Sequence, residues 1–91
     1  MYWIKQTKPY KRSIKKIRTS GNKDFISETE EITRQLSEGG KLGDKHRDHE
    51  LSGQFKGYRE CHIRPDLLLI YQISGKCLIL VNMGSHSELF G

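Results

Sequence analysis

Apolar residues near the start of the chain recur at helical spacing. Tyr10, Ile14 and Ile17 are separated by four and three residues, which places them on one face of an α-helix. Pro9 suits the first turn of such a helix, and the Ser-Gly-Asn stretch at residues 20–22 breaks it. The pattern therefore predicts a helix that begins near Pro9 and ends before this break.

A second helical stripe follows the break. It consists of Phe25, Thr29, Ile32 and Leu36. Asp24 is a suitable N-cap, and the two glycines at residues 39–40 favour the end of the helix. The two stripes together predict a pair of helices joined by a short turn.

Four other segments have the composition of β-strands, namely residues 2–7, 57–63, 67–73 and 77–83. The third of them, LLLIYQI, is apolar on both faces, which is typical of a central strand. Short turns at residues 64–66 and 74–76 join the last three strands, so these strands run antiparallel. Residues 41–57 are rich in glycine and charge and are predicted to form a loop.

The order β-α-α-β-β-β predicts an α+β fold. We expect a mainly antiparallel four-stranded sheet with the two N-terminal helices on one face. The chain of 91 residues suits one domain over residues 1–91. The second face of the sheet is left partly open, and we expect the functional site there.

Composition excludes several classes of protein. Hydrophobic residues make up 34% of the chain and fall in periodic blocks, which argues against disorder. No apolar run approaches the roughly 20 residues of a membrane span, and no apolar segment typical of a signal peptide follows the basic N-terminus. Cys61 and Cys77 both lie in predicted strands and are expected to be reduced thiols, as in cytosolic proteins.

The net charge of +5 is concentrated near the N-terminus. The basic residues of the first twenty positions are Lys5, Lys8, Lys11, Arg12, Lys15, Lys16 and Arg18, and no acid accompanies them. This segment is a candidate surface for a phosphate backbone. Charge alone equally allows a solvated helix face that is balanced by the acidic second helix.

All four histidines lie in the second half of the chain. Strand alternation places Tyr58, Glu60 and His62 on one face, and the Pro-containing turn brings Asp66 close to His62. His86 follows the last strand, which neighbours the central one. Imidazoles and a carboxylate can cleave RNA by acid–base catalysis, because the 2′-OH of RNA is itself the nucleophile. The cations that could stabilise the charged intermediate are Lys56, Arg59 and Arg64.

Two alternatives remain at this point. Each histidine could be an ordinary polar residue, and His46 and His49 lie in a charged loop where solvation is the simplest interpretation. A metal site is the second alternative, because His46 and His49 are three residues apart and His62, Asp66 and His86 could complete it. Neither cysteine has the spacing to histidine that structural zinc sites favour, so no metal or other cofactor is predicted.

Two motifs in this region are those of a known family. The segment DHELSGQFKGYRECHIRPDLLLIY, which begins at Asp48, and the segment GSHSELF, which ends at Phe90, resemble the YafQ branch of the RelE superfamily. Its members are toxins of bacterial type II toxin–antitoxin systems. The two motifs cover close to half of the chain with matching spacing.

The resemblance implies a cytoplasmic bacterial endoribonuclease that cuts mRNA on the ribosome without a metal. The implied partners are an antitoxin, the ribosome with its mRNA, and operator DNA through the antitoxin complex, but no membrane. The family's functional positions correspond to His49, His62, Asp66, His86 and Phe90.

The implied roles follow from these positions. His86 is expected to be the general acid, Asp66 or His49 the general base, and His62 a phosphate-holding group or a partner in that proton transfer. Phe90 is expected to position a base. The cations expected to bind ribosomal RNA are Lys8, Lys11, Arg12, Lys15 and Lys16.

The chain departs from the family pattern at two positions. Leu67 stands where many relatives have tryptophan, and Asn82 stands where relatives commonly have a basic residue. Leu67 is expected to alter a groove surface or a stacking contact. Asn82 leaves the rate and the codon preference open, and Lys56, Arg59 or Arg64 could compensate for the missing cation. A non-catalytic domain of the same fold that binds RNA or the ribosome and inhibits translation is the alternative function.

Overall fold

One five-stranded sheet organises the chain. The structure is a computed structural model that describes residues 1–91. Its strands are β1 (Trp3–Gln6), β2 (His49–Glu50), β3 (Arg59–Arg64), β4 (Leu67–Ser74) and β5 (Cys77–Gly84), in the spatial order β1-β5-β4-β3-β2. β1 pairs parallel with β5, and all other neighbours are antiparallel. The α+β class and the mainly antiparallel sheet are thus confirmed.

The predicted number of four strands is wrong. The additional strand, β2, consists of His49 and Glu50, which pair with Glu60 and Arg59 of β3 inside the segment that was expected to be a loop. Such a short, charged strand has no hydrophobic alternation of its own, so only its pairing with β3 identifies it.

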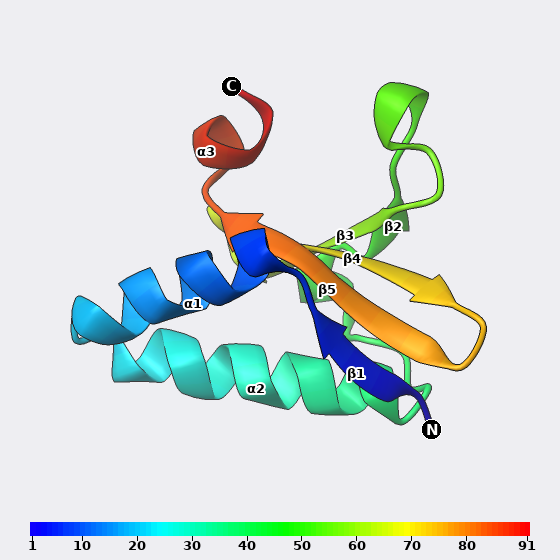
Figure 1. Ribbon diagram of the computed structural model, residues 1–91, viewed down its shortest axis with the longest axis horizontal. Coiled ribbons are helices and arrows are strands. Elements are labelled where there is room, and N and C mark those ends of the chain that lie inside the picture. The colour runs from blue at the N-terminus through cyan, green and yellow to red at the C-terminus, as the bar shows by residue number, and fades with distance from the viewer.

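The helices lie on two sides of the sheet. The long helices α1 (Lys8–Thr19) and α2 (Lys23–Ser37) lie together beneath one face, whereas the short helix α3 (His86–Phe90) rises from the other face (Figure 1). Two 3₁₀ turns, η1 (Asp44–His46) and η2 (Gly53–Phe55), flank β2. We call the sheet face opposite α1 and α2 the open face.

The two long helices begin differently: α1 has a side-chain cap, whereas the cap residue of α2 makes no side-chain capping hydrogen bond. The Thr7 hydroxyl accepts a hydrogen bond from Tyr10 N at 3.3 Å, so α1 begins at Lys8. The predicted N-cap of α2, Asp24, is wrong, because the cap position is Asn22. Asp24 lies in the first turn, where its negative charge still favours the positive end of the helix dipole.

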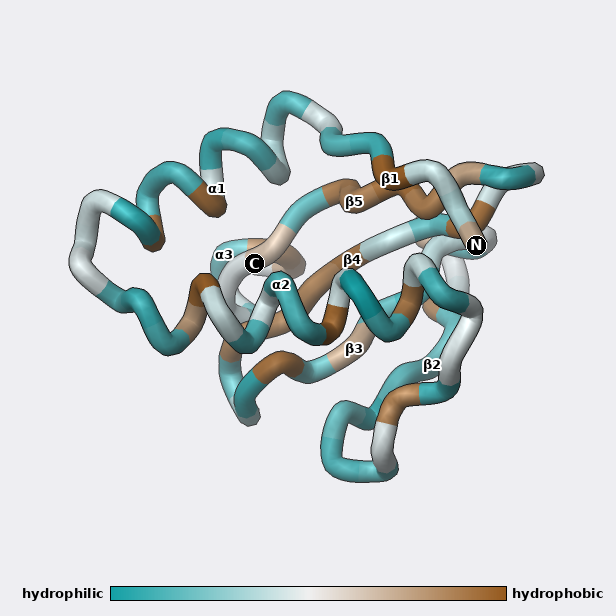
Figure 2. Tube along the Cα trace, turned by 90° about the horizontal axis from the view of Figure 1, so that it is seen from below, coloured by the Kyte–Doolittle hydropathy of each residue, from teal (hydrophilic) through white to brown (hydrophobic).

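The core lies between α1, α2 and the sheet. It contains Tyr10 and Ile14 of α1, Ile32 and Leu36 of α2, and apolar residues of β3, β4 and β5. Viewed from the helix side, hydrophobic positions are interspersed with hydrophilic ones along both helices in front of the sheet (Figure 2). The helical spacing in the sequence therefore predicted these buried positions correctly.

β4 is buried on both faces. Leu67, Leu69 and Tyr71 belong to the core on the helix side, and Leu68 and Ile70 are buried on the open face, at 1% and 4% exposure. The central place predicted for this strand is confirmed by its position between β5 and β3. No helix of the structure combines the length and the apolar character that crossing a bilayer requires.

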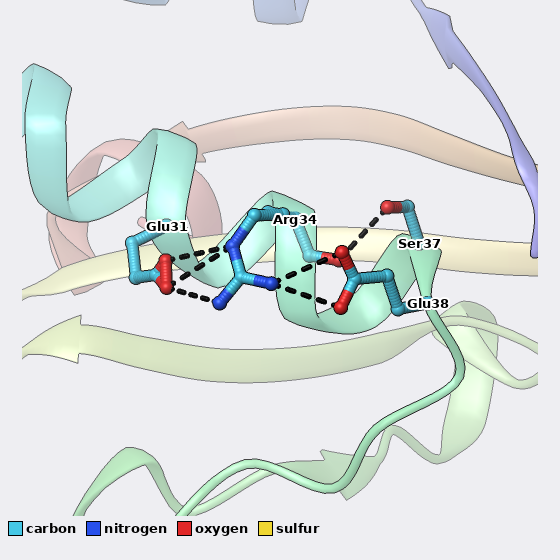
Figure 3. Close-up of polar contacts among 4 residues, drawn as sticks. All are labelled: Glu31, Arg34, Ser37 and Glu38. Carbon is cyan, nitrogen blue, oxygen red and sulfur yellow. Dashed lines mark hydrogen bonds and ion pairs between the residues drawn. The ribbon is translucent and has the colours of Figure 1, made fainter.

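The single arginine of α2 is paired with two glutamates. Arg34 forms hydrogen-bonded ion pairs with Glu31 on one side and with Glu38 on the other, the latter at 2.9 and 3.0 Å (Figure 3). The Ser37 hydroxyl donates to the Arg34 carbonyl at 2.8 Å. This helix therefore presents no free arginine to a polyanion.

A polar cluster of three side chains fixes the segment before β2. The Tyr71 hydroxyl donates to Asp48 Oδ1 at 2.6 Å, and Arg59 Nε donates to the same oxygen at 3.3 Å and to the Tyr71 hydroxyl at 3.2 Å. We call these residues the Asp48 clamp. Burial, followed by the hydrogen bond to Asp48, raises the pKa of Tyr71, so its hydroxyl keeps the proton that it donates.

Truncation of Leu69 tests the packing of β4. Leu69 is 0% exposed, so Leu69→Ala removes buried methyl groups and leaves a cavity. We expect the free energy of unfolding to fall by about 2–5 kcal/mol in urea titrations. Ile73→Ala on the same strand is the control, because Ile73 is 41% exposed, and it should cost less than about 1 kcal/mol. Equal losses in both variants would contradict the burial described for β4.

Titration of Tyr71 tests the Asp48 clamp. A raised pKa in the folded state means that the contribution of Tyr71 to stability is complete below its unfolded pKa of about 10. This contribution is lost as the pH rises through the higher folded pKa. Tyr71→Phe should cost about 1–3 kcal/mol at neutral pH, because Asp48 and Arg59 lose a partner. Its deficit relative to the native chain should shrink above about pH 10.

Urea unfolding at several pH values between neutral and strongly alkaline measures this deficit. Tyr2→Phe, at a half-buried tyrosine outside the clamp, is the control and should follow the native curve. A deficit for Tyr71→Phe that stays constant across the alkaline range would show that Tyr71 does not titrate as described.

Candidate functional site

Strand register brings the candidate residues into two neighbouring rows on the open face. In the first row, His49 of β2 pairs with Glu60 of β3, Glu60 pairs with Ile70 of β4, and Ile70 pairs with Asn82 of β5. The second row consists of His62, Leu68 and Gly84. Adjacent strands are about 4.8 Å apart, so each row extends across the sheet in steps of this size.

An irregularity in β5 determines which of its residues join these rows. Tyr71 pairs with Leu80 but Ile70 pairs with Asn82, so Val81 is an extra residue between the two pairs. The alternation therefore shifts, and Met83 rather than Asn82 continues the core face after Leu78 and Leu80. The Asn82 carboxamide oxygen accepts hydrogen bonds from the Ser13 hydroxyl at 3.0 Å and from Met83 N at 2.8 Å.

Glu60 is a buried carboxylate between two histidines. It is 5% exposed, and its Oε1 lies 3.2 Å from His62 Nε2 and 3.9 Å from His49 Nε2. The sequence placed Glu60 on the same face as His62 but gave it no role. The signal that could have found it is the strict alternation of β3, because a carboxylate two residues from a candidate histidine on a strand must share its face.

Both histidines are oriented by backbone carbonyls. His49 Nδ1 lies 2.7 Å from the Arg47 carbonyl, and His62 Nδ1 lies 3.2 Å from the Pro65 carbonyl. The Nε2 atom of each ring is therefore the one directed toward Glu60. His46, the fourth histidine of the sequence, uses Nδ1 to contact the His62 carbonyl at 2.7 Å and supports β3 from the η1 side.

Asp66 and His86 form the other end of the site. Asp66 Oδ1 accepts a hydrogen bond from His86 N at 3.0 Å, which joins the β3–β4 turn to the first residue of α3. Ser85 caps α3 in a reciprocal capping box with Glu88, and the hydrogen bonds from Ser85 lower the pKa of the Glu88 carboxyl. The Asp66 carboxylate is bonded to α3 rather than to His62, although one turn carries both residues.

Three aromatic rings join α3 to η2. The ring centroids of His86 and Phe90 are 5.1 Å apart, and those of Phe90 and Phe55 are 5.4 Å apart in an edge-to-face arrangement. Figure 1 shows both segments rising from the open face, and the Phe55–Phe90 contact joins them. Phe55 was not predicted as a site residue, because nothing in its local sequence indicates that it meets the C-terminus.

The three candidate cations of this region have other surroundings. Arg59 lies in the Asp48 clamp, and strand alternation places it on the face of β3 opposite Glu60. Arg64 donates to both oxygens of Glu28 at 2.7 and 2.8 Å, which lowers the pKa of that carboxyl, and stacks 4.4 Å above the Phe25 ring. Lys56 is exposed directly after η2. The two rows themselves contain no arginine or lysine.

A stripe of cations runs along the exposed side of α1. It consists of Lys8, Lys11, Arg12 and Lys15, which are all exposed and form no ion pair with a carboxylate. Their spacing of three and four residues puts them on one helix face, away from the buried Tyr10 and Ile14. Lys16, the fifth predicted cation, lies 3.7 Å from Glu88 of α3.

The chain is similar in sequence and in structure to known bacterial toxins. The mRNA interferase toxin YafQ of Escherichia coli K12 is 46% identical over 46 residues, which is 50% of this chain and 50% of that protein. The chain thus matches about half the length of its curated relatives. A copper-bound mutant toxin from Helicobacter pylori is 37% identical and covers 99% of this chain and all of its own, with a TM-score of 0.92. The E. coli DinJ–YafQ complex matches with 26% identity, a TM-score of 0.88 and full coverage of both chains.

The copper-bound relative raises the question of a metal at this site. In this structure, no group of three or more histidine, cysteine, aspartate or glutamate side chains is arranged to hold a metal ion. Glu60 Oε1 is directed at the two histidines, 3.2 Å from His62 Nε2 and 3.9 Å from His49 Nε2. The side chains as placed therefore do not fit a metal.

The family assignment extends over almost the entire chain. The family model described as "Bacterial toxin of type II toxin-antitoxin system, YafQ" matches residues 2–91. The relatives above agree with it in sequence and in fold, and the resemblance inferred from the two motifs is confirmed. The chain belongs to the YafQ family of bacterial type II toxins.

Proposed function

We propose that the protein is an endoribonuclease toxin that cleaves mRNA. The observation that carries this proposal is the pair His49 and His62 on either side of the buried Glu60 carboxylate on the open face. The helix α3, which begins with His86, rises from the same face and is held to Asp66 through the His86 backbone N. Relatives named mRNA interferase toxin support the same activity. The site offers proton donors and acceptors next to an exposed face, and acid–base cleavage of RNA requires these groups.

The reaction that fits this site is an internal transfer within the RNA. The 2′-oxygen attacks the adjacent phosphorus while its proton passes to a general base. The P–O5′ bond then breaks as a general acid protonates the leaving 5′-oxygen. The products are a 2′,3′-cyclic phosphate and a free 5′-OH.

The surroundings of each residue support one assignment of these roles. His86 is exposed at the start of α3 and is assigned as the general acid. His49 is assigned as the general base, because the other candidate, Asp66, uses an oxygen to hold His86 N. Asp66 then acts by positioning His86.

His62 is assigned to the phosphate. Its Nδ1 lies 3.2 Å from the Pro65 carbonyl and its Nε2 lies 3.2 Å from Glu60 Oε1, so the ring is held in place from both sides. A ring N–H held at this place can stabilise the charge that develops on the phosphorane. This role has added weight here, because Arg59 and Arg64 are bonded elsewhere and position 82 is an asparagine.

The partners proposed for the protein follow from its charge and its family. An antitoxin is the first partner, as in the solved DinJ–YafQ complexes of relatives. The cation stripe of α1 supports binding to ribosomal RNA, which would bring the toxin to translated mRNA in the bacterial cytoplasm. Operator DNA is proposed as a partner only through the antitoxin complex.

Replacement of His86 tests the nuclease. After brief expression in a bacterium, mapping of 5′ ends on a reporter mRNA should reveal discrete cuts within the coding region for the native chain. His86→Ala should reduce the cutting rate about 10²–10⁴-fold, the usual contribution of a general acid. His46→Gln is the matched control, because the one hydrogen bond of the His46 side chain is to the His62 carbonyl and glutamine can still donate to it.

Growth arrest with intact mRNA in both the native chain and His86→Ala would reject the nuclease. The protein would then be a non-catalytic inhibitor that binds the ribosome. Cutting that persists in His86→Ala would retain the nuclease but remove His86 as its acid.

Charge reversal on α1 tests the ribosome contact. The triple variant Lys11→Glu, Arg12→Glu and Lys15→Glu should bind purified ribosomes more weakly, because it loses three cations of the stripe. The slope of log affinity against log salt concentration should also fall by about two to three. Sedimentation with ribosomes at several salt concentrations measures both quantities.

The control for this variant has the same change in net charge. Lys23→Glu, Lys41→Glu and Lys76→Glu alter exposed lysines that lie outside α1. If both triple variants bind ribosomes equally, net charge and not the stripe determines binding.

A further inference from the structure

A hollow on the open face lies beside the two histidine rows. Its volume is about 470 Å³, within the usual range for small-molecule sites. Its lining includes Gln54, Phe55, Tyr58, Ile70, Asn82 and Leu89. We call it the base hollow.

The strand register places this hollow next to the proposed chemistry. Ile70, on its floor, pairs with Glu60 on one side and with Asn82 on the other. Phe55, on its wall, contacts Phe90, which in turn contacts His86. A group inside the hollow is therefore about one strand spacing from the carboxylate that holds His62.

The residues around the base hollow favour a planar, uncharged ligand. Phe55 and Tyr58 supply aromatic faces, and Ile70 and Leu89 supply apolar contacts. None of the lining residues is charged, so a phosphate or an acidic peptide finds no counter-ion there. Aromatic walls of this kind suit the π-face of an unstacked nucleobase.

Asn82, which lines the hollow, has free side-chain N–H groups. Its carboxamide oxygen already accepts from Ser13 Oγ and Met83 N, which occupies both of its lone pairs. Only the Nδ2 hydrogens remain to meet a ligand. Gln54, exposed at the rim, has a free amide that can donate or accept.

We propose that the base hollow holds one nucleobase of the RNA strand, that of a nucleotide next to the cleaved phosphate. Phe55 and Tyr58 contact the faces of the base, and Asn82 Nδ2 donates to an acceptor atom on its edge. This inference rests on the proposed ribonuclease function and names the element that selects its cleavage sites. It also gives a role to Asn82, at the position where relatives commonly have a basic residue.

Binding of mononucleotides tests the hollow without requiring cleavage. The full chain with His86→Ala is titrated with the four nucleoside 3′-monophosphates and, as the base-free control, with ribose 5-phosphate, while NMR signals are followed. At least one nucleotide should give saturable shifts at the Phe55 and Tyr58 rings and at the Asn82 side-chain amide. Ribose phosphate should not shift these signals.

Two further substitutions complete the binding test. Phe55→Leu should weaken nucleotide binding roughly five- to hundredfold, the usual effect of losing one base–aromatic stack. Phe25→Leu removes an aromatic ring on α2 that lies outside the hollow and should leave the affinity unchanged. Shifts that do not saturate, that do not depend on the base, or that are insensitive to Phe55→Leu would overturn the proposal. Antitoxin binding that protects the hollow while nucleotides do not bind would assign it to a protein contact instead.

The cleavage pattern tests the role of Asn82. Asn82→Asp keeps an oxygen for Ser13 Oγ and Met83 N but removes the Nδ2 donors. The mapped cuts should change in base preference at one nucleotide position. A uniform loss of cutting with an unchanged preference would show that Asn82 does not contact a base. If the native chain makes no cuts at all, the ribonuclease proposal fails, and the mononucleotide titration alone decides whether the hollow binds a base.

Discussion

The packing of β3 against the helices is the constraint on which the site depends. Cys61 and Ile63 are buried in the core, at 0% and 7% exposure. Because side chains alternate along a strand, this burial forces Glu60 and His62 onto the open face. A shift of one residue in the pairing of β3 would exchange the two sets and place a carboxylate and an imidazole among apolar side chains. The hydrophobic core thus fixes the orientation of the site.

The rest of the site is attached to this strand through few contacts. The Asp48 clamp ties the residue before His49 to Tyr71 of the buried central strand. The hydrogen bond from His86 N to Asp66 ties α3 to the β3–β4 turn. His49, His62 and His86 therefore belong to three different segments. The segments of His49 and His86 are both held to β3 and β4 or to the turn between them. Both links are polar and partly exposed, so we expect them to open more readily than the core.

Much of the fold could be predicted from the sequence, since it follows from local periodicity. The stripes of α1 and α2 and the apolar run of β4 are strong patterns, and the structure contains all three. β2 could not be predicted, because two charged residues have no period and gain their strand conformation from β3. The helix α3 was not predicted, because a helix of five residues is too short to show a stripe of apolar residues. Its sequence does contain one signal of a helix start, the Ser85–Glu88 capping box before two apolar residues.

The candidate site was predictable to a different degree. His62 followed from strand alternation. His49 was considered but given little weight until the resemblance to the family, and Phe90 had no role before it. Glu60 and Phe55 depend on contacts across the sheet and across two loops, which no local pattern encodes. The structure gives Arg59 and Arg64 partners that the sequence did not predict. Both lie close to the histidines in sequence, but their guanidinium groups bond to Asp48 and Glu28. Sequence proximity locates a charge on the chain but does not tell which carboxylate binds it.

The exposed cations of α1 and the histidines of the open face lie on different parts of the molecule. The cations of α1 are exposed and form an uninterrupted stripe, whereas the two histidine rows contain no arginine or lysine. Long-range attraction to a polyanion therefore originates on the helix side and acts through solvent, where salt weakens it. The open face holds its carboxylate buried between two imidazoles, where the interaction is shorter and less screened. With the roles proposed above, RNA binding and selection of the cut can change independently, because substitutions on α1 would alter the first and substitutions around the base hollow would alter the second.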